Sequence, residues 1–229
     1  MLSVGGAYGI ILGCCAIGIL YGIINYLRVR SVKLEEHGSD GESGYTPLNK
    51  DIEGERELDK DQIKQMLFIG ERISEGANAF LGKEYTYVGI FVLCFTIVVW
   101  GACDSFKAPW TAICFIAGAA TSILSGFIGM TVAVQSNYRT AFEARHTLAP
   151  AFKVAFRAGC VMGFILSSLA LLVLTILIAC FKPSLETSQG DGFATLQTAF
   201  DQIAGYGLGG STVALFGRVG GGIYTKAAD

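Results

Sequence analysis

Residues 205–229 read GYGLGGSTVALFGRVGGGIYTKAAD, an apolar and glycine-rich segment that carries three charged side chains. Arg218 lies within the apolar part, and Lys226 and Asp229 lie at its far end. A charged side chain in a segment of membrane length is costly, so such residues are functional candidates by default. The segment therefore predicts a membrane helix that carries part of a functional site.

The composition of the whole chain also indicates a membrane protein. Of its 229 residues, 52% are hydrophobic and 16% are charged, and the mean hydropathy is +0.51. Soluble domains have about 25% charged residues. The 30 glycines fit membrane helices, in which glycine is common. We expect an all-α fold, a polytopic bundle of about five transmembrane helices. The net charge of −2 gives no indication of a nucleic-acid partner.

The cysteines and histidines do not predict a metal or cofactor site. The seven cysteines lie in or beside apolar runs, without a CxxC pair or a Cys/His spacing typical of zinc. We interpret them as buried thiols of helices in the lipid phase. His37 and His146 stand alone in polar segments, which predicts solvated side chains.

The chain divides into three parts by polarity. Residues 1–27 contain no charged side chain and are long enough to cross about 30 Å of hydrocarbon, which predicts a first transmembrane helix. A signal peptide is the alternative, but its basic start and cleavage site are not evident. Residues 28–65 are predicted to form a cytosolic polar loop, with helix resuming near Asp61. Residues 66–229 form the remaining membrane domain, with further spans at about 85–102, 110–134, 158–181 and from 193 onward.

Short connections are predicted between these spans. Residues 104–109 form a turn, and a helix break is expected before Pro150. Residues 182–192 are predicted to be a loop that Pro183 opens.

The distribution of basic residues orients the spans. If the N-terminus lies on the non-cytosolic side, only Lys107 and Lys182 fall in outer loops. Every other Lys and Arg then lies on the cytosolic side or, for Arg218, inside the fifth helix. The positive-inside rule therefore favours an outer N-terminus, and Lys226 and Asp229 emerge into the cytosol.

The three charges of the fifth helix are predicted to share one side of it. Arg218 and Asp229 are eleven residues apart, which is about 1100° of helical turn and places them within about 20° of each other. Lys226 lies about 60° from Asp229. The carboxylates of this chain do not lie close to Arg218 on the fifth helix, which predicts a partner on a helix outside the chain.

The glycines of this segment favour packing over nucleotide binding. Gly205, Gly207 and Gly210 spell GxGxxG, but no strand precedes them, as a dinucleotide site would need. Gly205/Gly209 and Gly217/Gly221 instead predict two small-residue faces for close helix packing.

Residues 217–229, GRVGGGIYTKAAD, resemble the signature of the membrane-integral inorganic pyrophosphatases, which pump protons or sodium ions. Residues 73–91, 125–146 and 155–174 resemble the second, third and fourth helix regions of the same pumps, in the same order. The resemblance covers about residues 66–229 and is to the vacuolar type of these pumps.

The resemblance implies a function and roles for the three charged residues. The family hydrolyses cytosolic pyrophosphate with Mg²⁺, moves H⁺ (favoured here over Na⁺) out of the cytosol, and works as a homodimer in the lipid bilayer. Some members are activated by K⁺. By resemblance, Lys226 contacts pyrophosphate, Asp229 holds the Mg²⁺-bound substrate, and Arg218 lies near the ion gate and hydrolytic centre. The vacuolar type implies the membrane of an acidic organelle.

Family sequences continue with further carboxylates after the position of Asp229. We therefore expect an N-terminal part of a longer pump, and expect the 229-residue chain alone to be inactive. Two alternatives remain open: a non-enzymatic small subunit or channel, and a secondary transporter, which would need a second repeat half. The plain alternative for Lys226 and Asp229 is an ion pair at a helix end, worth a few tenths of a kcal/mol.

Overall fold

The computed structural model describes residues 4–32, 60–104, 106, 108–144, 147–187 and 192–228. These residues form helices and their connections, with no strand among them. The helices are α1 (Val4–Arg30), α2 (Lys60–Ala102), α3 (Trp110–Ala144), α4 (Leu148–Thr187) and α5 (Gly192–Ala228). The expected all-α helical bundle is therefore confirmed.

Four of these helices, α1 to α4, are long and apolar enough to cross a membrane. Helix α5 has 37 residues, so it is long enough, but it does not reach the same apolarity. The many glycines of α5 contribute little to its mean hydropathy, and Arg218 lowers that mean further. A fifth crossing therefore stays a prediction.

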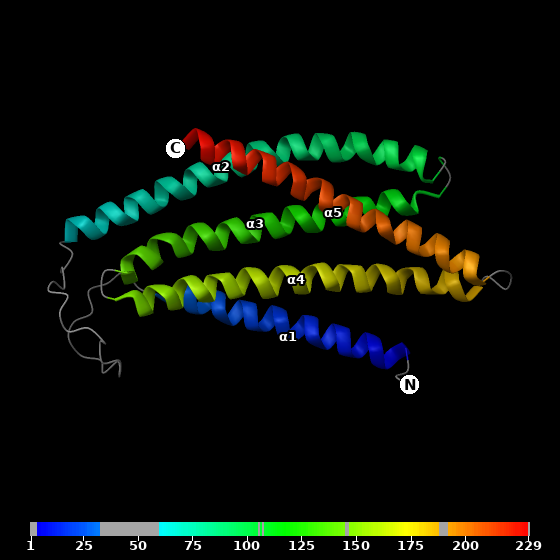
Figure 1. Ribbon diagram of the computed structural model, residues 1–229, viewed down its shortest axis with the longest axis horizontal. Helices are drawn as coiled ribbons and strands as arrows, with labels where there is room; N and C mark the ends of the chain where they lie inside the picture. The colour runs from blue at the N-terminus through cyan, green and yellow to red at the C-terminus, as the bar shows by residue number, and fades with distance from the viewer. Residues whose placement is uncertain are drawn as a thin grey trace.

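Successive helices run in opposite directions (Figure 1). The start of α1, the α2–α3 junction and the α4–α5 junction lie toward one end of the bundle. The start of α2, the α3–α4 junction and the end of α5 lie toward the other end. This alternation is what successive membrane crossings require, and it places Arg28, Arg30 and Lys226 toward the same end.

Helix α3 is the centre of the bundle, because each of the three buried clusters includes one of its residues. The clusters join α3 to α1 and α4, to α2 and α5, and to α4 and α5; their α3 members are Val132, Ala119 and Cys114. Helix α5 therefore packs on a helix that the rest of the fold holds in place.

Glycine allows α3 and α5 to pack backbone to backbone. A Cβ atom on Gly209 would collide with the carbonyl oxygen of Phe115, and one on Gly205 would lie 2.5 Å from the carbonyl oxygen of Thr111. The predicted packing face at Gly205 and Gly209 is confirmed. At the second predicted face, a Cβ on Gly217 would lie 3.9 Å from Glu84 Oε1, whereas one on Gly221 would meet no described atom, so packing at Gly221 stays a prediction.

Several predicted boundaries differ from the observed ones. Helix α1 continues past residue 27 to Arg30, because Arg28 and Arg30 suit the negative end of the helix dipole. Helix α4 continues through Pro183 to Thr187, so the predicted loop start at Lys182 is wrong. Pro183 removes one hydrogen bond near a helix end, which a long helix tolerates. The break before Pro150 is confirmed, since α3 ends at Ala144 and α4 begins at Leu148.

The cysteines are less buried than expected. Cys15 and Cys114 are buried, whereas Cys14, Cys94, Cys103 and Cys180 are exposed on the outside of the bundle. Hydrophobicity along the sequence does not separate a side that faces lipid from a side that faces other helices. His37 and His146 lie outside the described residues, as does most of the predicted polar loop.

Candidate functional site

Helix α5 carries the sequence-predicted site residues, and it is continuous from Gly192 to Ala228. Arg218 and Lys226 are eight residues apart on it, which is about 80° of rotation and about 12 Å of rise. They therefore lie on neighbouring parts of one side of α5. Asp229 lies outside the described residues, so its predicted position next to Lys226 stays a prediction.

Arg218 and Lys226 are both exposed. The ion pairs found among the described residues, Lys64–Asp61 and Arg72–Glu75, involve neither of them. Around Arg218, the large apolar side chains of Leu215 and Val219 are also exposed, by 62% and 55%. This side of α5 is therefore a wide apolar surface with one cation in it.

The opposite side of α5 packs on α2 through aromatic pairs. The rings of Phe80 and Tyr224 have centroids 4.6 Å apart, and those of Phe91 and Phe216 are also 4.6 Å apart. These contacts fix the rotation of α5 about its own axis. The side that carries Arg218 is turned away from them as a result.

Between these two aromatic pairs lies Glu84, a residue that the sequence did not single out. Its Oε1 atom is buried and has no hydrogen-bond partner among the described residues. A Cβ atom on Gly220 would lie 2.7 Å from this oxygen, and one on Gly217 would lie 3.9 Å from it. The feature of the sequence that could have identified Glu84 is its position directly before the apolar run that begins at Tyr85.

The described residues do not fit a magnesium centre. No group of three or more His, Cys, Asp or Glu side chains that could hold a metal ion occurs among them. Mg²⁺ prefers carboxylate and phosphate oxygens in octahedral geometry. We therefore derive no chemical step through a metal from this chain.

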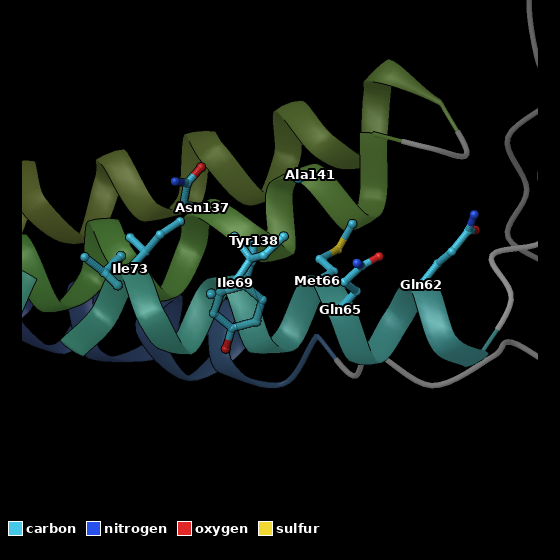
Figure 2. A pocket seen from close by; sticks show the side chains of 10 residues that line it. Gln62, Gln65, Met66, Ile69, Ile73, Asn137, Tyr138 and Ala141 are labelled. Carbon is cyan, nitrogen blue, oxygen red and sulfur yellow. The ribbon is translucent and has the colours of Figure 1, made fainter. Parts of the chain in front are cut away.

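A cavity of about 320 Å³ lies between α2 and α3, near the start of α2 (Figure 2). Its polar lining consists of the amide side chains of Gln62, Gln65 and Asn137 and the ring of Tyr138, beside apolar residues such as Ile69. No charged side chain lines it among the residues that the structure describes. A multiply charged anion needs cations around it, so this cavity does not suit pyrophosphate.

Comparison with known proteins gives a consistent result. The sequence model of the family described as inorganic H⁺ pyrophosphatase matches residues 16–229. A K⁺-insensitive pyrophosphate-energized proton pump of Moorella thermoacetica is 42% identical over 167 residues, which is 72% of this chain and 23% of the relative. A protein of Clostridium tetani, named as a candidate K⁺-stimulated pyrophosphate-energized sodium pump, is 40% identical over 166 residues, 72% of this chain and 22% of the relative.

A third relative is a K⁺-insensitive pyrophosphate-energized proton pump of Methanosarcina mazei. It is 36% identical over 166 residues, which again cover 72% of this chain and 22% of the relative. The chain therefore spans less than a quarter of the length of these relatives. Two of the relatives are named as proton pumps, and one is named as a candidate sodium pump.

Proposed function

This chain belongs to the inorganic H⁺ pyrophosphatase family, and from that premise we propose that it forms part of a membrane pump. The pump couples hydrolysis of cytosolic pyrophosphate to H⁺ transport out of the cytosol. The observation that carries the proposal is the continuous helix α5, which joins an arginine in an apolar surface to a lysine about two turns further on. Coupled transport needs such a connection between a hydrolytic site and a membrane path.

The two cations have different proposed roles. Lys226 places a positive point charge near the end of α5, where it binds a phosphate oxygen of pyrophosphate. Arg218 lies within the apolar part and acts at the ion gate, where it holds acidic groups of other helices. The proposed role of Asp229 is to supply a carboxylate that helps to hold the Mg²⁺-bound substrate.

The remaining features of the proposal come from the family. They are dependence on Mg²⁺, K⁺ as a candidate activator, a homodimer, and an acidic-organelle membrane with the N-terminus on its non-cytosolic side. The 229-residue chain alone does not hydrolyse pyrophosphate in this proposal, since the described residues lack a carboxylate cluster.

Transport in sealed vesicles tests the proposal. The native polypeptide that contains these residues is reconstituted, and pyrophosphate and Mg²⁺ are added outside while a dye reports the internal pH. We expect acidification of the interior that an uncoupler abolishes. Na⁺ uptake without acidification would replace H⁺ by Na⁺ as the transported ion. Ion flux that does not depend on pyrophosphate would contradict the pump and support the channel alternative.

A further inference from the structure

Three arginines lie where the uncharged parts of three membrane helices end. Arg139 directly follows the uncharged part of α3, Arg157 directly precedes that of α4, and Arg30 lies three residues after that of α1. These uncharged parts are residues 110–138, 158–181 and 4–27. Helices α1 and α3 end, and α4 begins, toward the same end of the bundle (Figure 1). The three arginines therefore lie at the boundary where membrane helices meet the lipid headgroups.

A hydrogen bond one turn away brings Arg30 and Arg139 to the same level. The Tyr26 hydroxyl of α1 donates to Oε1 of Gln135 on α3 at 3.2 Å. The two helices run in the same direction (Figure 1). Arg30 is four residues after Tyr26, and Arg139 is four residues after Gln135, so each lies only about 40° around its helix from the bonded residue. The two arginines therefore leave facing sides of α1 and α3.

Arg157 of α4 lies at that level too. A Cβ atom on Gly22 of α1 would collide with the side chain of Ile165, so these two residues are level with each other. Helices α1 and α4 run in opposite directions (Figure 1). Arg30 is eight residues after Gly22, and Arg157 is eight residues before Ile165. The same number of residues therefore carries both helices to the same level.

Arg139 and Arg157 also lie on the sides of their helices that face the junction of α1, α3 and α4. A buried cluster fills that junction and includes Val132 and Val161. Arg139 is seven residues after Val132, which places it within about 20° of the same side of α3. Arg157 is four residues before Val161, within about 40° on α4. Both arginines are half-buried, whereas Arg30 is exposed.

The three cations have no acidic partner in the described part of the chain. The ion pairs found there include none of them, and Glu143, one turn beyond Arg139 on α3, does not pair with it. The Arg139 guanidinium lies 4.6 Å from the ring centroid of Tyr138, and its Nη1 donates to the Gln135 carbonyl oxygen. Its Nε atom is buried without an acceptor. Like charges at one level and a buried donor without an acceptor are both unfavourable, and a bound anion would relieve both.

We propose that Arg30, Arg139 and Arg157 form a binding site for the phosphate group of an anionic lipid. Guanidinium groups suit phosphate because their planar set of donors matches its oxygens. Basic pockets between membrane helices bind lipid headgroups in this way. The site adjoins the uncharged helix parts, so the lipid chains lie along apolar helix surfaces while the phosphate meets the arginines. This position favours a lipid over free phosphate, and the site does not depend on the proposed pumping function.

Photo-crosslinking in vesicles tests the site. The native polypeptide is reconstituted in phosphatidylcholine that contains a small fraction of phosphatidylserine with a photoreactive group beside its headgroup. After illumination, crosslinked peptides of α1, α3 and α4 are quantified by mass spectrometry. We expect crosslinks at the ends that carry the three arginines, and a yield about fivefold lower in Arg139→Gln. Arg139→Lys keeps the charge and should lower the yield less.

Two further variants make the result specific. Arg30→Gln removes an exposed cation, so it should lower the yield without a change in the unfolding midpoint, even if Arg139→Gln disturbs the fold. Arg72→Gln is the matched control, because Arg72 is an exposed arginine of α2 that pairs with Glu75 at 2.7 Å. Its yield should equal that of the wild type. A phosphatidylcholine probe with the same photoreactive group should crosslink at least about fivefold less at this site than the anionic probe.

Equal crosslinking in the wild type, Arg30→Gln and Arg139→Gln would overturn the site. Equal yields for the anionic and the phosphatidylcholine probe would overturn the preference for an anionic lipid. Sodium phosphate is compared with sodium chloride at equal ionic strength. Suppression of the crosslinks by phosphate alone would assign the arginines to a free anion and overturn the lipid as their ligand.

Discussion

Gly209 of α5 and Phe115 of α3 lie so close that a single methyl group on Gly209 would overlap the carbonyl oxygen of Phe115. The obstacle is backbone, which cannot rotate away as the end of a side chain can. This approach sets the spacing between α3 and α5, the helix that carries Arg218 and Lys226.

We expect Gly209→Ala to destabilise the folded protein by about 1–3 kcal/mol, because α5 must move away from α3 to make room. The measurement is the thermal unfolding midpoint of the native polypeptide in detergent. Gly207→Ala is the matched control: a Cβ there meets no described atom, and alanine favours helix over glycine by up to about 1 kcal/mol. Equal midpoints for the two variants would contradict the close packing.

Asp104 caps the start of α3. Its Oδ1 atom accepts a hydrogen bond of 2.6 Å from the Thr111 hydroxyl, and its Oδ2 atom accepts one of 3.3 Å from the backbone N–H of Ala112. We expect Asp104→Ala to destabilise the protein by about 1 kcal/mol, as loss of a helix cap does. The same unfolding measurement checks this.

Asp61→Ala is the comparison for the cap. Asp61 is 86% exposed in the first turn of α2 and pairs with Lys64 at 3.9 Å, so its loss should change stability by less than about 0.5 kcal/mol. A larger effect at Asp61 than at Asp104 would show that the capping contacts do not stabilise α3.

Arg218→Ala should separate function from stability. Arg218 is exposed and forms no ion pair in the described conformation, so its removal should leave the unfolding midpoint nearly unchanged. Pyrophosphate-dependent ion uptake should be lost if Arg218 acts at the gate. Normal uptake by vesicles that contain Arg218→Ala would remove Arg218 from the site.

Most helix boundaries follow from local features of the sequence. Helix α3 begins at Trp110, directly after Pro109, and α2 ends at Ala102, before a polar turn; both ends agree with the predicted spans. The Gly205/Gly209 face was predictable because a four-residue spacing repeats on one side of a helix. Helix boundaries and glycine spacing are properties of a single helix, so its own sequence is enough to predict them.

Features that depend on two helices were not predictable in this way. The contact of Glu84 with Gly220 requires the relative height and rotation of α2 and α5, which helical periodicity does not contain. For the same reason, the sequence did not single out Gly220, which is the glycine that lies next to Glu84 of α2. The cap by Asp104 acts on Thr111, seven residues further on, beyond the spacing of standard capping patterns.

The most direct test of the account is pyrophosphate hydrolysis by the native polypeptide with and without Lys226. Membranes that contain the wild type, Lys226→Ala or the control Lys64→Ala are compared for phosphate release at equal protein amounts. Lys64 is 79% exposed on α2 and pairs only weakly with Asp61. The account predicts hydrolysis by the wild type and Lys64→Ala, and a loss of about tenfold or more in Lys226→Ala, as expected when a charged contact to phosphate is removed. Hydrolysis by Lys226→Ala at the wild-type rate, or no hydrolysis by the wild type, would contradict it.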